Sequence, residues 1–400
     1  MNDQELLKET FSRMHASDDT LAEVLKMAEQ GKRGKHFIRK SSAVIAAAAV
    51  TGTVVMAATV HQWSRGMQHQ LQGTTEQMQE LEDKNIAAFP EQSVTDEGVT
   101  VSVVQSIVNG SWGHIALKVS GYDLPDGKEP GFDEADLSIE GWEGSFGIGS
   151  SFDDGLLTNG YRVIGPDGGA PETEEDGSLA FKWEDENGDL EYLFDIYIND
   201  EPGKEQPSLS GQEVKIHLEG LGYYKGKAED CLVQIPGTWD FAFTLPGADE
   251  VRKYTDLDCP IGDSGAVLKE LEVSPISIAV TYAFPRNILT ETGYYEEMIT
   301  EEDGTQHPQS TPFEREYYEE PPLLTGVKLK DGTVLMGING GPGSSGYVDE
   351  DSGIWVNRFG TGKILDPDEI ASLLFLDRNT LPEEEVPDIT EENCFEVSIR

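Results

Sequence analysis

The sequence predicts a mainly β protein with a short helical head and one transmembrane helix at its N-terminal end. Three observations lead to this prediction: helical periodicity in the first thirty residues, an uncharged stretch from Ser41 to Val60, and alternating strand patterns from Val94 onward. The 400 residues exceed one ordinary core. We therefore expect a helical head at 1–40, a transmembrane helix at 41–62, a juxtamembrane stalk at 63–89, and two β domains at 90–250 and 261–400.

Charge separates the two ends of the chain. Residues 1–80 hold nine Lys and Arg against nine Asp and Glu, whereas residues 81–400 hold twenty against sixty-six, so the net charge of −46 lies in the second part. A surface this acidic repels phosphate backbones, which argues against a nucleic-acid partner. Binding of calcium or of polycations stays open.

The uncharged run SSAVIAAAAVTGTVVMAATV has the length that a helix needs to cross about 30 Å of hydrocarbon. Five basic residues crowd its N-terminal side, whereas Arg65 is the only Lys or Arg in the next twenty positions. This asymmetry predicts a single-pass protein of the cell membrane, with a cytoplasmic N-terminus and extracellular β domains. A cleaved signal peptide is the first alternative, but about forty residues precede the run. A buried Ala-rich helix is the second, but it does not need the basic cluster.

The spacing of apolar residues in the head predicts two short amphipathic helices, each with an apolar stripe. Thirty residues bury too little apolar surface to offset the ordering of their own chain, so we expect the stripes to bind a partner. The candidate partner-binding residues are Leu7, Phe11, Met14, Leu21, Val24 and Leu25. Two alternatives are that the helices pack only on each other, or that they lie on the membrane surface.

The residues after the apolar run change character twice. Residues 61–88 are Gln-rich and interrupted by Gly66 and Gly73, which predicts a frayed helical stalk that acts as a spacer. From Val94 onward, short alternating segments such as VTVSVVQSIV, LEYLFDIYI and EVKIHLEGL are separated by Gly, Pro, Asn and Asp. This pattern is typical of antiparallel β structure.

A second β unit is predicted after the break at Pro260-Ile261-Gly262. Asp331-Gly332 predicts a hairpin turn, and the terminal FEVSIR predicts a closing strand. Asp366-Pro367 predicts the start of a short helix that turns Ile370, Leu373 and Leu374 inward. The acidic stretch 291–322 has too little apolar content for a core and is predicted to be a solvated loop.

No motif predicts an enzyme, a cofactor or a metal site. The glycine run at 341–346 matches a dinucleotide fingerprint, but YVDEDSG follows it instead of a helix, so we expect a hairpin loop. The acidic turns 185–189 and 349–353 offer oxygen ligands for calcium, yet neither fits the twelve-residue calcium loop, and ordinary turns are the simpler interpretation. The histidines are isolated in the sequence, so we assign no catalytic residue.

The three cysteines, Cys231, Cys259 and Cys394, lack the two-residue spacing of zinc or redox pairs. In an oxidising exterior two of them could form a disulfide, and we take Cys231 and Cys259 as the candidate pair, although the sequence does not decide which two pair. The alternative is three reduced cysteines that behave as small hydrophobic residues.

Three stretches also carry a family resemblance: HASDDTLAEVLKM before the apolar run, QSVTDEGVTVSVVQSI after it, and LEVSPISIAVTY near the start of the last unit. In this order they resemble the domain-of-unknown-function family four-one-seven-nine of Gram-positive bacteria, which is similar to transmembrane anti-sigma factors. The resemblance implies that the head holds an extracytoplasmic-function sigma factor and that two immunoglobulin-like sandwiches sense the envelope. Many anti-sigma heads bind zinc through a His/Cys pattern; no cysteine precedes Cys231, so this head would be of the metal-free kind.

Two functions follow as hypotheses. The first is a single-pass membrane signalling protein, an anti-sigma factor whose ectodomain responds to a ligand or state that the sequence does not name. The alternative is a membrane-anchored adhesion or cell-wall-binding protein with no transcriptional role. An exported hydrolase is a third possibility that no motif supports.

Overall fold

The computed structural model describes residues 63–142, 144–159, 162–174, 176–198, 207–224, 231–300, 306–348, 352–381 and 389–399. All of them belong to the unit His61–Arg400. The predicted head, with its six candidate partner-binding residues, and the predicted span at 41–62 lie outside this part of the chain. Within it, no helix combines the length and apolar character that crossing a membrane requires.

The structure confirms the mainly β class. Strands dominate the described residues, and every ladder between two named strands is antiparallel. Strand β10 (Glu213–Tyr224) illustrates why: Val214, Ile216 and Leu218 are buried, whereas the residues between them face outward. Alternation with a period of two places one face of such a strand against a core.

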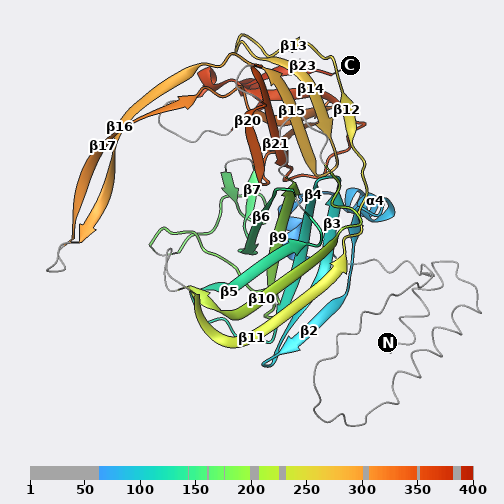
Figure 1. Cartoon of the computed structure of the whole chain (residues 1–400), viewed down its shortest axis with the longest axis vertical. Coiled ribbons are helices and arrows are strands. Elements are labelled where there is room, and N and C mark those ends of the chain that lie inside the picture. The colour runs from blue at the N-terminus through green and yellow to red at the C-terminus, as the bar shows by residue number, and fades with distance from the viewer. Residues whose placement is uncertain are drawn as a thin grey trace, which may run out of the picture. The chain divides into compact units, whose positions relative to one another are not determined.

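Two sheets share the first core (Figure 1). The larger has the order β1-β3-β4-β9-β6 with β2 paired to β3, and the smaller has the order β11-β10-β5. Trp239 of the smaller sheet is fully buried and donates its indole N–H to the Val99 carbonyl at 3.2 Å. The strands are β1 (Ala87–Ala88), β2 (Gln92–Asp96), β3 (Val99–Asn109), β4 (Trp112–Ser120), β5 (Glu129–Ile139), β6 (Phe146–Phe152), β9 (Leu190–Ile198), β10 and β11 (Cys231–Thr244), and a separate ribbon joins β7 (Leu157–Asn159) to β8 (Arg162–Ile164).

Two further sheets share the second core. One has the order β12-β14-β15-β21-β20 with β13 paired to β14, and the other has the order β19-β18-β22-β23. The buried rings of Tyr282 and Phe375, one from each sheet, meet edge to face with centroids 5.9 Å apart. The strands are β12 (Arg252–Tyr254), β13 (Cys259–Pro260), β14 (Val267–Val273), β15 (Ser277–Ala283), β18 (Leu324–Leu329), β19 (Val334–Met336), β20 (Gly343–Tyr347), β21 (Ile354–Gly360), β22 (Ile370–Leu376) and β23 (Cys394–Ser398). The 3-10 turns η1 (Arg378–Thr380) and η2 (Glu391–Asn393) lie between β22 and β23.

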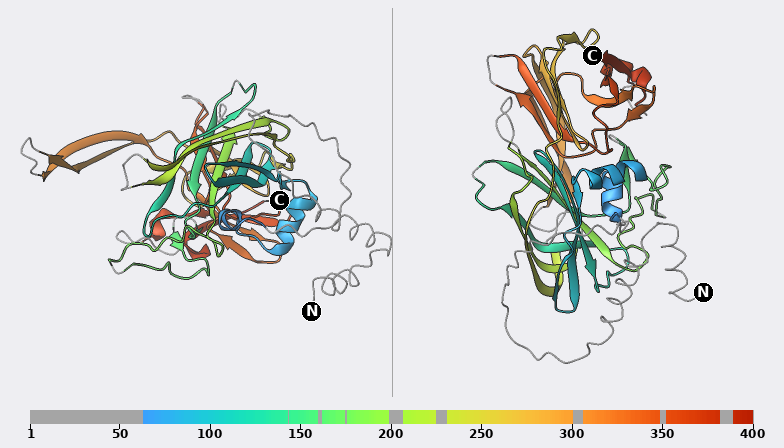
Figure 2. Two further views of the ribbon diagram at one scale, coloured as in Figure 1. Left: turned by 90° about the horizontal axis from the view of Figure 1, so that it is seen from below. Right: turned by 90° about the vertical axis from the view of Figure 1, so that its right-hand side faces the viewer.

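Residues 63–89 are built into the fold, which differs from the predicted spacer. Helices α3 (Arg65–Gln70) and α4 (Thr75–Asp83) do form, but Met67, Leu71 and Leu81 are buried. They belong to a third core that also contains Ile276 and Ile364 from the second β unit. Figure 2 shows both helices where strands of the two β units approach one another. The prediction failed because scattered Met and Leu residues in a Gln-rich stretch resemble a solvated helix until their partners are known.

The predicted helix after Asp366-Pro367 is wrong. Residues 366–369 form a turn, and Ile370, Leu373 and Leu374 lie buried in strand β22 instead. This strand is paired on both sides, to β18 and β23, so nearly all of its residues are buried. A short apolar run of this kind does not distinguish a fully buried strand from a helix.

The acidic stretch 291–322 is also not a simple loop. Strands β16 (Ile288–Thr300) and β17 (Gln306–Tyr318) pair along their length as a curved two-stranded ribbon (Figure 1). Cross-strand pairs hold it, for example Arg315 Nε, which donates to Glu291 Oε2 at 2.7 Å. Backbone pairing does not require a core on either face, so low apolar content did not exclude strands here.

The predicted hairpin at Asp331-Gly332 and the closing strand in FEVSIR are confirmed. Gly332 has φ +90°, a left-handed conformation that glycine adopts without a steric cost, and Asp331 Oδ1 accepts a hydrogen bond from the Thr333 backbone N–H at 2.8 Å. The glycine run at 341–346 enters strand β20, which pairs with β21, so in the described residues up to 348 a strand and not a helix follows the run.

Candidate functional site

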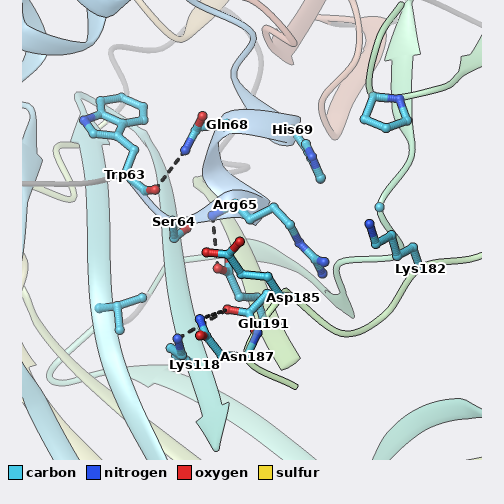
Figure 3. A pocket seen from close by; sticks show the side chains of 14 residues that line it. Trp63, Ser64, Arg65, Gln68, His69, Lys118, Lys182, Asp185, Asn187 and Glu191 are labelled. Carbon is cyan, nitrogen blue, oxygen red and sulfur yellow. Dashed lines mark hydrogen bonds and ion pairs between the residues drawn. The ribbon is translucent and has the colours of Figure 1, made fainter. Parts of the chain in front are cut away.

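The candidate site surrounds α3, the first described helix after the predicted membrane span. A cavity of about 490 Å³ lies beside this helix and includes Arg65, Gln68, His69, Lys118 and Lys182 in its lining (Figure 3). The cavity walls come from α3, from strands β3, β4 and β9, and from the segment between β8 and β9. The site therefore joins residues that the sequence separates by more than a hundred positions.

The first three backbone N–H groups of helix α3 all have hydrogen-bond acceptors. Ser64 is the N-cap, and its Oγ accepts a hydrogen bond from the Met67 backbone N–H at 3.2 Å. The carboxylate of Glu191 on β9 accepts from the backbone N–H groups of Arg65 at 3.0 Å and Gly66 at 2.6 Å. A buried carboxylate is favourable here because these N–H groups have no partner within the helix.

Gly66 allows the helix to lie this close to β9. A Cβ added at this position would stand 3.0 Å from Leu193 Cδ2 and 3.1 Å from Glu191 Oε2. The glycine that looked like an interruption of a stalk is thus a point of close approach between α3 and the sheet.

Asp153 is the central charge of the site. Its side chain is 3% exposed, and its two oxygens contact Arg65 Nε at 2.7 Å and His69 Nδ1 at 2.8 Å. Burial opposes ionisation of this carboxyl, but the hydrogen bond to His69 and the charges of His69 and Arg65 outweigh it and hold the pKa of Asp153 below its usual range. Arg65 also donates to the carbonyls of Trp183 at 2.7 Å and Glu184 at 2.9 Å. The guanidinium is therefore held on several sides.

Residues that follow α3 form hydrogen bonds with the second β unit. The Gln72 backbone N–H donates to the Gly362 carbonyl at 3.1 Å, and Lys363 Nζ donates to the Gln72 side chain at 3.2 Å. The Gln77 amide on α4 donates to the Ile364 carbonyl at 2.9 Å. Burial lowers the pKa of Lys363. We call residues 63–89, held by both β units in this way, the clamp.

In the first acidic turn considered as a calcium site, residues 185–189, the carboxylates of Asp185 and Asp189 already have partners within the protein. Asp185 Oδ1 accepts from the backbone N–H groups of Asn187 at 2.7 Å and Asp189 at 3.0 Å, and Lys118 Nζ lies 2.7 Å from Asp189 Oδ2. The lysine supplies the positive charge that a calcium ion would bring. Residues 349–351 of the second acidic turn lie outside the described residues.

The three thiols are free, so the candidate bridge between Cys231 and Cys259 is not formed. Cys231 Sγ donates to the Gly131 carbonyl at 3.4 Å, and Cys259 Sγ donates to the Leu257 carbonyl at 3.1 Å. The two residues belong to strands of different sheets, β11 and β13. Cys394 contacts Thr325 Oγ1 at 3.5 Å.

Sequence reasoning noted Arg65 only as a lone positive charge after the apolar run and missed its partners. Asp153 and Glu191 carry no local signal among the acidic residues of the chain, because their importance depends on contacts across 88 and 126 positions. Their charges are used in internal bonds that hold the clamp in place.

Comparison with known proteins adds little to this picture. No protein-family model and no curated protein matches the sequence. One solved structure, the conserved domain protein from Bacillus anthracis, is similar over 79% of this chain and 90% of that chain, with 12% sequence identity and a TM-score of 0.36.

Proposed function

We propose that this chain is a single-pass membrane signalling protein of the anti-sigma-factor type. Its N-terminal helices, through Leu7, Phe11, Met14, Leu21, Val24 and Leu25, would hold an extracytoplasmic-function sigma factor at the cytoplasmic face. Residues 41–62 would cross the bilayer. The two β units would be extracellular sandwiches of immunoglobulin-like type that respond to the state of the envelope.

The observation that carries the proposal is the clamp. Arg65 stands three residues beyond the predicted membrane span, and it is bonded to Asp153 in the first β unit. Gln72 and Gln77, a few residues later, are bonded to the second β unit. An anchor for an adhesion domain needs only a flexible spacer at this place. A signalling protein needs a connection that can pass on a movement, and the bonds of the clamp to both β units support one.

The clamp also explains how a signal could pass. Burial of Met67 and Leu71 stabilises the clamped arrangement by about 1.5–3 kcal/mol for each side chain, as an upper estimate. Ligand binding or mechanical load that moves one β unit against the other would break bonds on one side of the segment. The released segment would then change the position of the attached membrane helix. In this scheme the signal shifts the population from a clamped state to a released state.

The first experiment tests the sigma-factor partner. The full-length chain would be captured from detergent-solubilised membranes of its own host, and the bound proteins identified by mass spectrometry. We expect a sigma factor with the wild-type chain and its loss with the double variant Leu21→Asp, Leu25→Asp, which places charges in the predicted apolar stripe. Recovery of no sigma factor, or equal recovery with both chains, would contradict the proposal.

A second experiment tests the connection. Arg65→Met should raise transcription from the promoter of the captured sigma factor, because it removes the ion pair that holds the clamp. Arg315→Met is the matched control, since Arg315 pairs with Glu291 on the exposed ribbon and not in the clamp. Equal transcription in both variants would argue for a head that acts without the ectodomain.

The second candidate function is a membrane-anchored adhesion protein, and the β16–β17 ribbon favours it. Tyr294 is 74% exposed and Ile288 57% exposed, and such side chains serve well in binding surfaces. Under this alternative, deletion of residues 2–30 would leave surface attachment unchanged, and no transcript would respond to Arg65→Met.

A further inference from the structure

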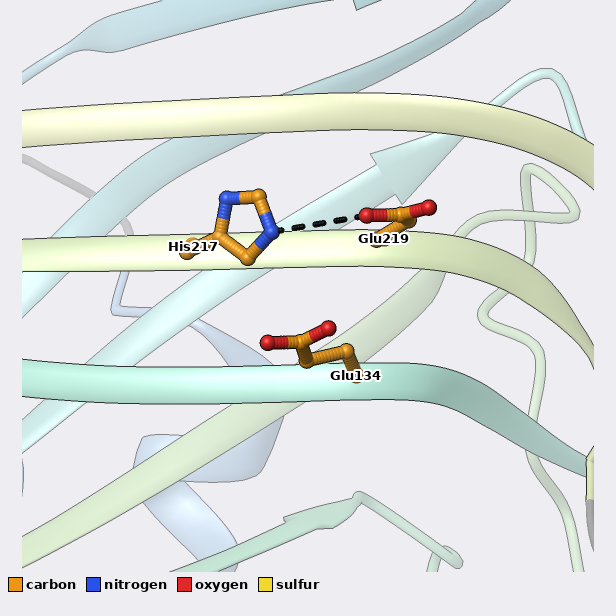
Figure 4. A group of neighbouring side chains, drawn as sticks. All are labelled: Glu134, His217 and Glu219. Atoms are coloured by element: carbon orange, nitrogen blue, oxygen red, sulfur yellow. Dashed lines mark ion pairs between the residues drawn. The ribbon is translucent and has the colours of Figure 1, made fainter.

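A histidine and two glutamates meet on the outward face of the smaller sheet of the first β unit. His217 and Glu219 lie two positions apart on β10, and Glu134 lies on the neighbouring strand β5 directly opposite Glu219 (Figure 4). One nitrogen or oxygen atom from each side chain lies within 4.8 Å of the other two. The strand register places these groups together, so no loop has to close over them.

Their spacing is close to that of a metal's ligands. Ligand atoms bound to Zn²⁺ at about 2.0–2.2 Å in tetrahedral geometry lie roughly 3.4 Å from one another. His217 Nε2 and Glu219 Oε2 are 3.7 Å apart. Glutamate has three side-chain torsions and both glutamates are exposed, so small rotations would bring all three ligand atoms onto one ion.

Asp240 on β11 orients the histidine from the other side. Its Oδ1 lies 2.7 Å from His217 Nδ1, so the neutral ring carries its proton on Nδ1 and leaves the Nε2 lone pair toward the two glutamates. Histidines that bind metals nearly always donate their second ring nitrogen to a carboxylate or carbonyl in this way. Asp240 is therefore a positioning residue and not a ligand.

The local charge also favours a cation. Glu134 and Glu219 face each other across the strands, and like charges in that position are destabilising. Asp136 stands opposite His217 and adds a further negative charge. Lys215, the lysine on the same face of β10, is bonded to Glu140 at 2.9 Å, and among the described residues neither Glu134 nor Glu219 has a Lys or Arg in an ion pair.

We propose that Glu134, His217 and Glu219 form a binding site for a divalent metal ion of the Zn²⁺ class, with Asp240 as the positioning partner of the histidine. An imidazole ligand favours Zn²⁺ over Ca²⁺ and Mg²⁺, which prefer oxygen ligands alone. Three protein ligands leave at least one position for water or for a group from another molecule. The site lies on β5 and β10, outside the clamp, so the proposal does not depend on the proposed function.

The test uses the untagged full-length chain, stripped with a chelator and titrated with Zn²⁺ by calorimetry. We expect a saturable site of one Zn²⁺ per chain that is lost in His217→Ala and weakened in Glu134→Gln. Asp240→Asn should weaken binding about 10–100-fold, as loss of an outer-shell partner does in other sites. Glu129→Gln removes an exposed carboxylate at the far end of β5 and should leave the affinity unchanged. His217 and Glu134 are on the surface, so circular dichroism should show all variants folded.

Three results would overturn the proposal. They are the absence of saturable Zn²⁺ binding, equal binding by the wild-type chain and His217→Ala, and equal competition by Ca²⁺. Co²⁺ gives an independent readout, because its visible absorption reports imidazole and carboxylate coordination. That absorption should appear with the wild-type chain and Glu129→Gln and be absent with His217→Ala.

Discussion

Arg65 Nε and Asp153 Oδ2 lie 2.7 Å apart, which joins a residue just beyond the predicted membrane span to a turn 88 positions away in the first β unit. The arginine side chain is 21% exposed and the aspartate 3% exposed, so water screens this pair only in part. His69 contacts the other oxygen of the same carboxylate. The pair is thus one bond of a small network that fixes helix α3 to the sheet.

Arg65→Met should destabilise the protein by about 3 kcal/mol, because it leaves the buried Asp153 carboxylate without its guanidinium. If the unit His61–Arg400 unfolds as a whole, that loss corresponds to a fall in Tm of about 4 °C. Thermal unfolding followed by tryptophan fluorescence would measure it. Arg315→Met, which breaks an exposed pair, should cost less than about 1 kcal/mol. Equal losses in the two variants would mean that the buried pair is no stronger than a surface one.

The acid dependence of stability should follow Asp153. Its pKa is lowered in the folded protein, so between that value and the ordinary value of about 3.9 the unfolded chain binds more protons than the folded chain. The stabilisation is present above about pH 3.9 and is lost as the pH falls through the folded pKa. Tm measured across the acid range should therefore fall more steeply in the wild-type chain than in Asp153→Asn.

The neighbouring Asp154 acts with the opposite sign. Burial and the charge of Asp153 raise its pKa, so its ionisation opposes folding as the pH rises. Between the ordinary value of about 3.9 and this raised pKa, Tm should therefore rise more steeply with pH in Asp154→Asn than in the wild-type chain. A slope that is the same in wild type, Asp153→Asn and Asp154→Asn would contradict both assignments.

Gly73→Ala should strain the junction between α4 and the second β unit. An added Cβ would stand 2.5 Å from Ile364 Cδ1, and overpacking of this kind costs about 1–3 kcal/mol. Ile364→Val removes that methyl group and alone costs about 0.5–1.5 kcal/mol. The double variant should be more stable than the sum of the two single changes predicts, as measured by Tm in a double-mutant cycle. Strict additivity would show that the two side chains do not meet.

All three cysteines should be free in the folded protein. Cys231 and Cys259 are placed in different sheets, each with its own carbonyl partner. Intact mass should be unchanged by reductant, and alkylation after unfolding should add three labels. Burial raises the pKa of Cys394 and of Cys231, so both should react slowly with iodoacetamide before unfolding. A mass increase of two hydrogens on reduction would restore the disulfide hypothesis.

Local sequence patterns predicted many of the strands but not which distant segments lie beside them. EVKIHLEGL predicted a strand with alternating faces, and β10 has them. The same alternation placed His217 and Glu219 on one face, yet the approach of Glu134 needed the register of β5. The run ASLLFL was ambiguous between helix and strand because a central strand is buried on both faces and loses the alternation.

The sequence by itself determined the mainly β class, the hairpin at Asp331-Gly332 and the closing strand, because each depends on neighbours within a few residues. Tertiary structure alone decided that Gly66 and Gly73 are points of close approach, that Arg65 pairs with Asp153, and that the predicted spacer is a clamp. These features depend on which distant segment lies beside each residue. Contacts between residues 88 or 126 positions apart leave no periodic pattern in the sequence.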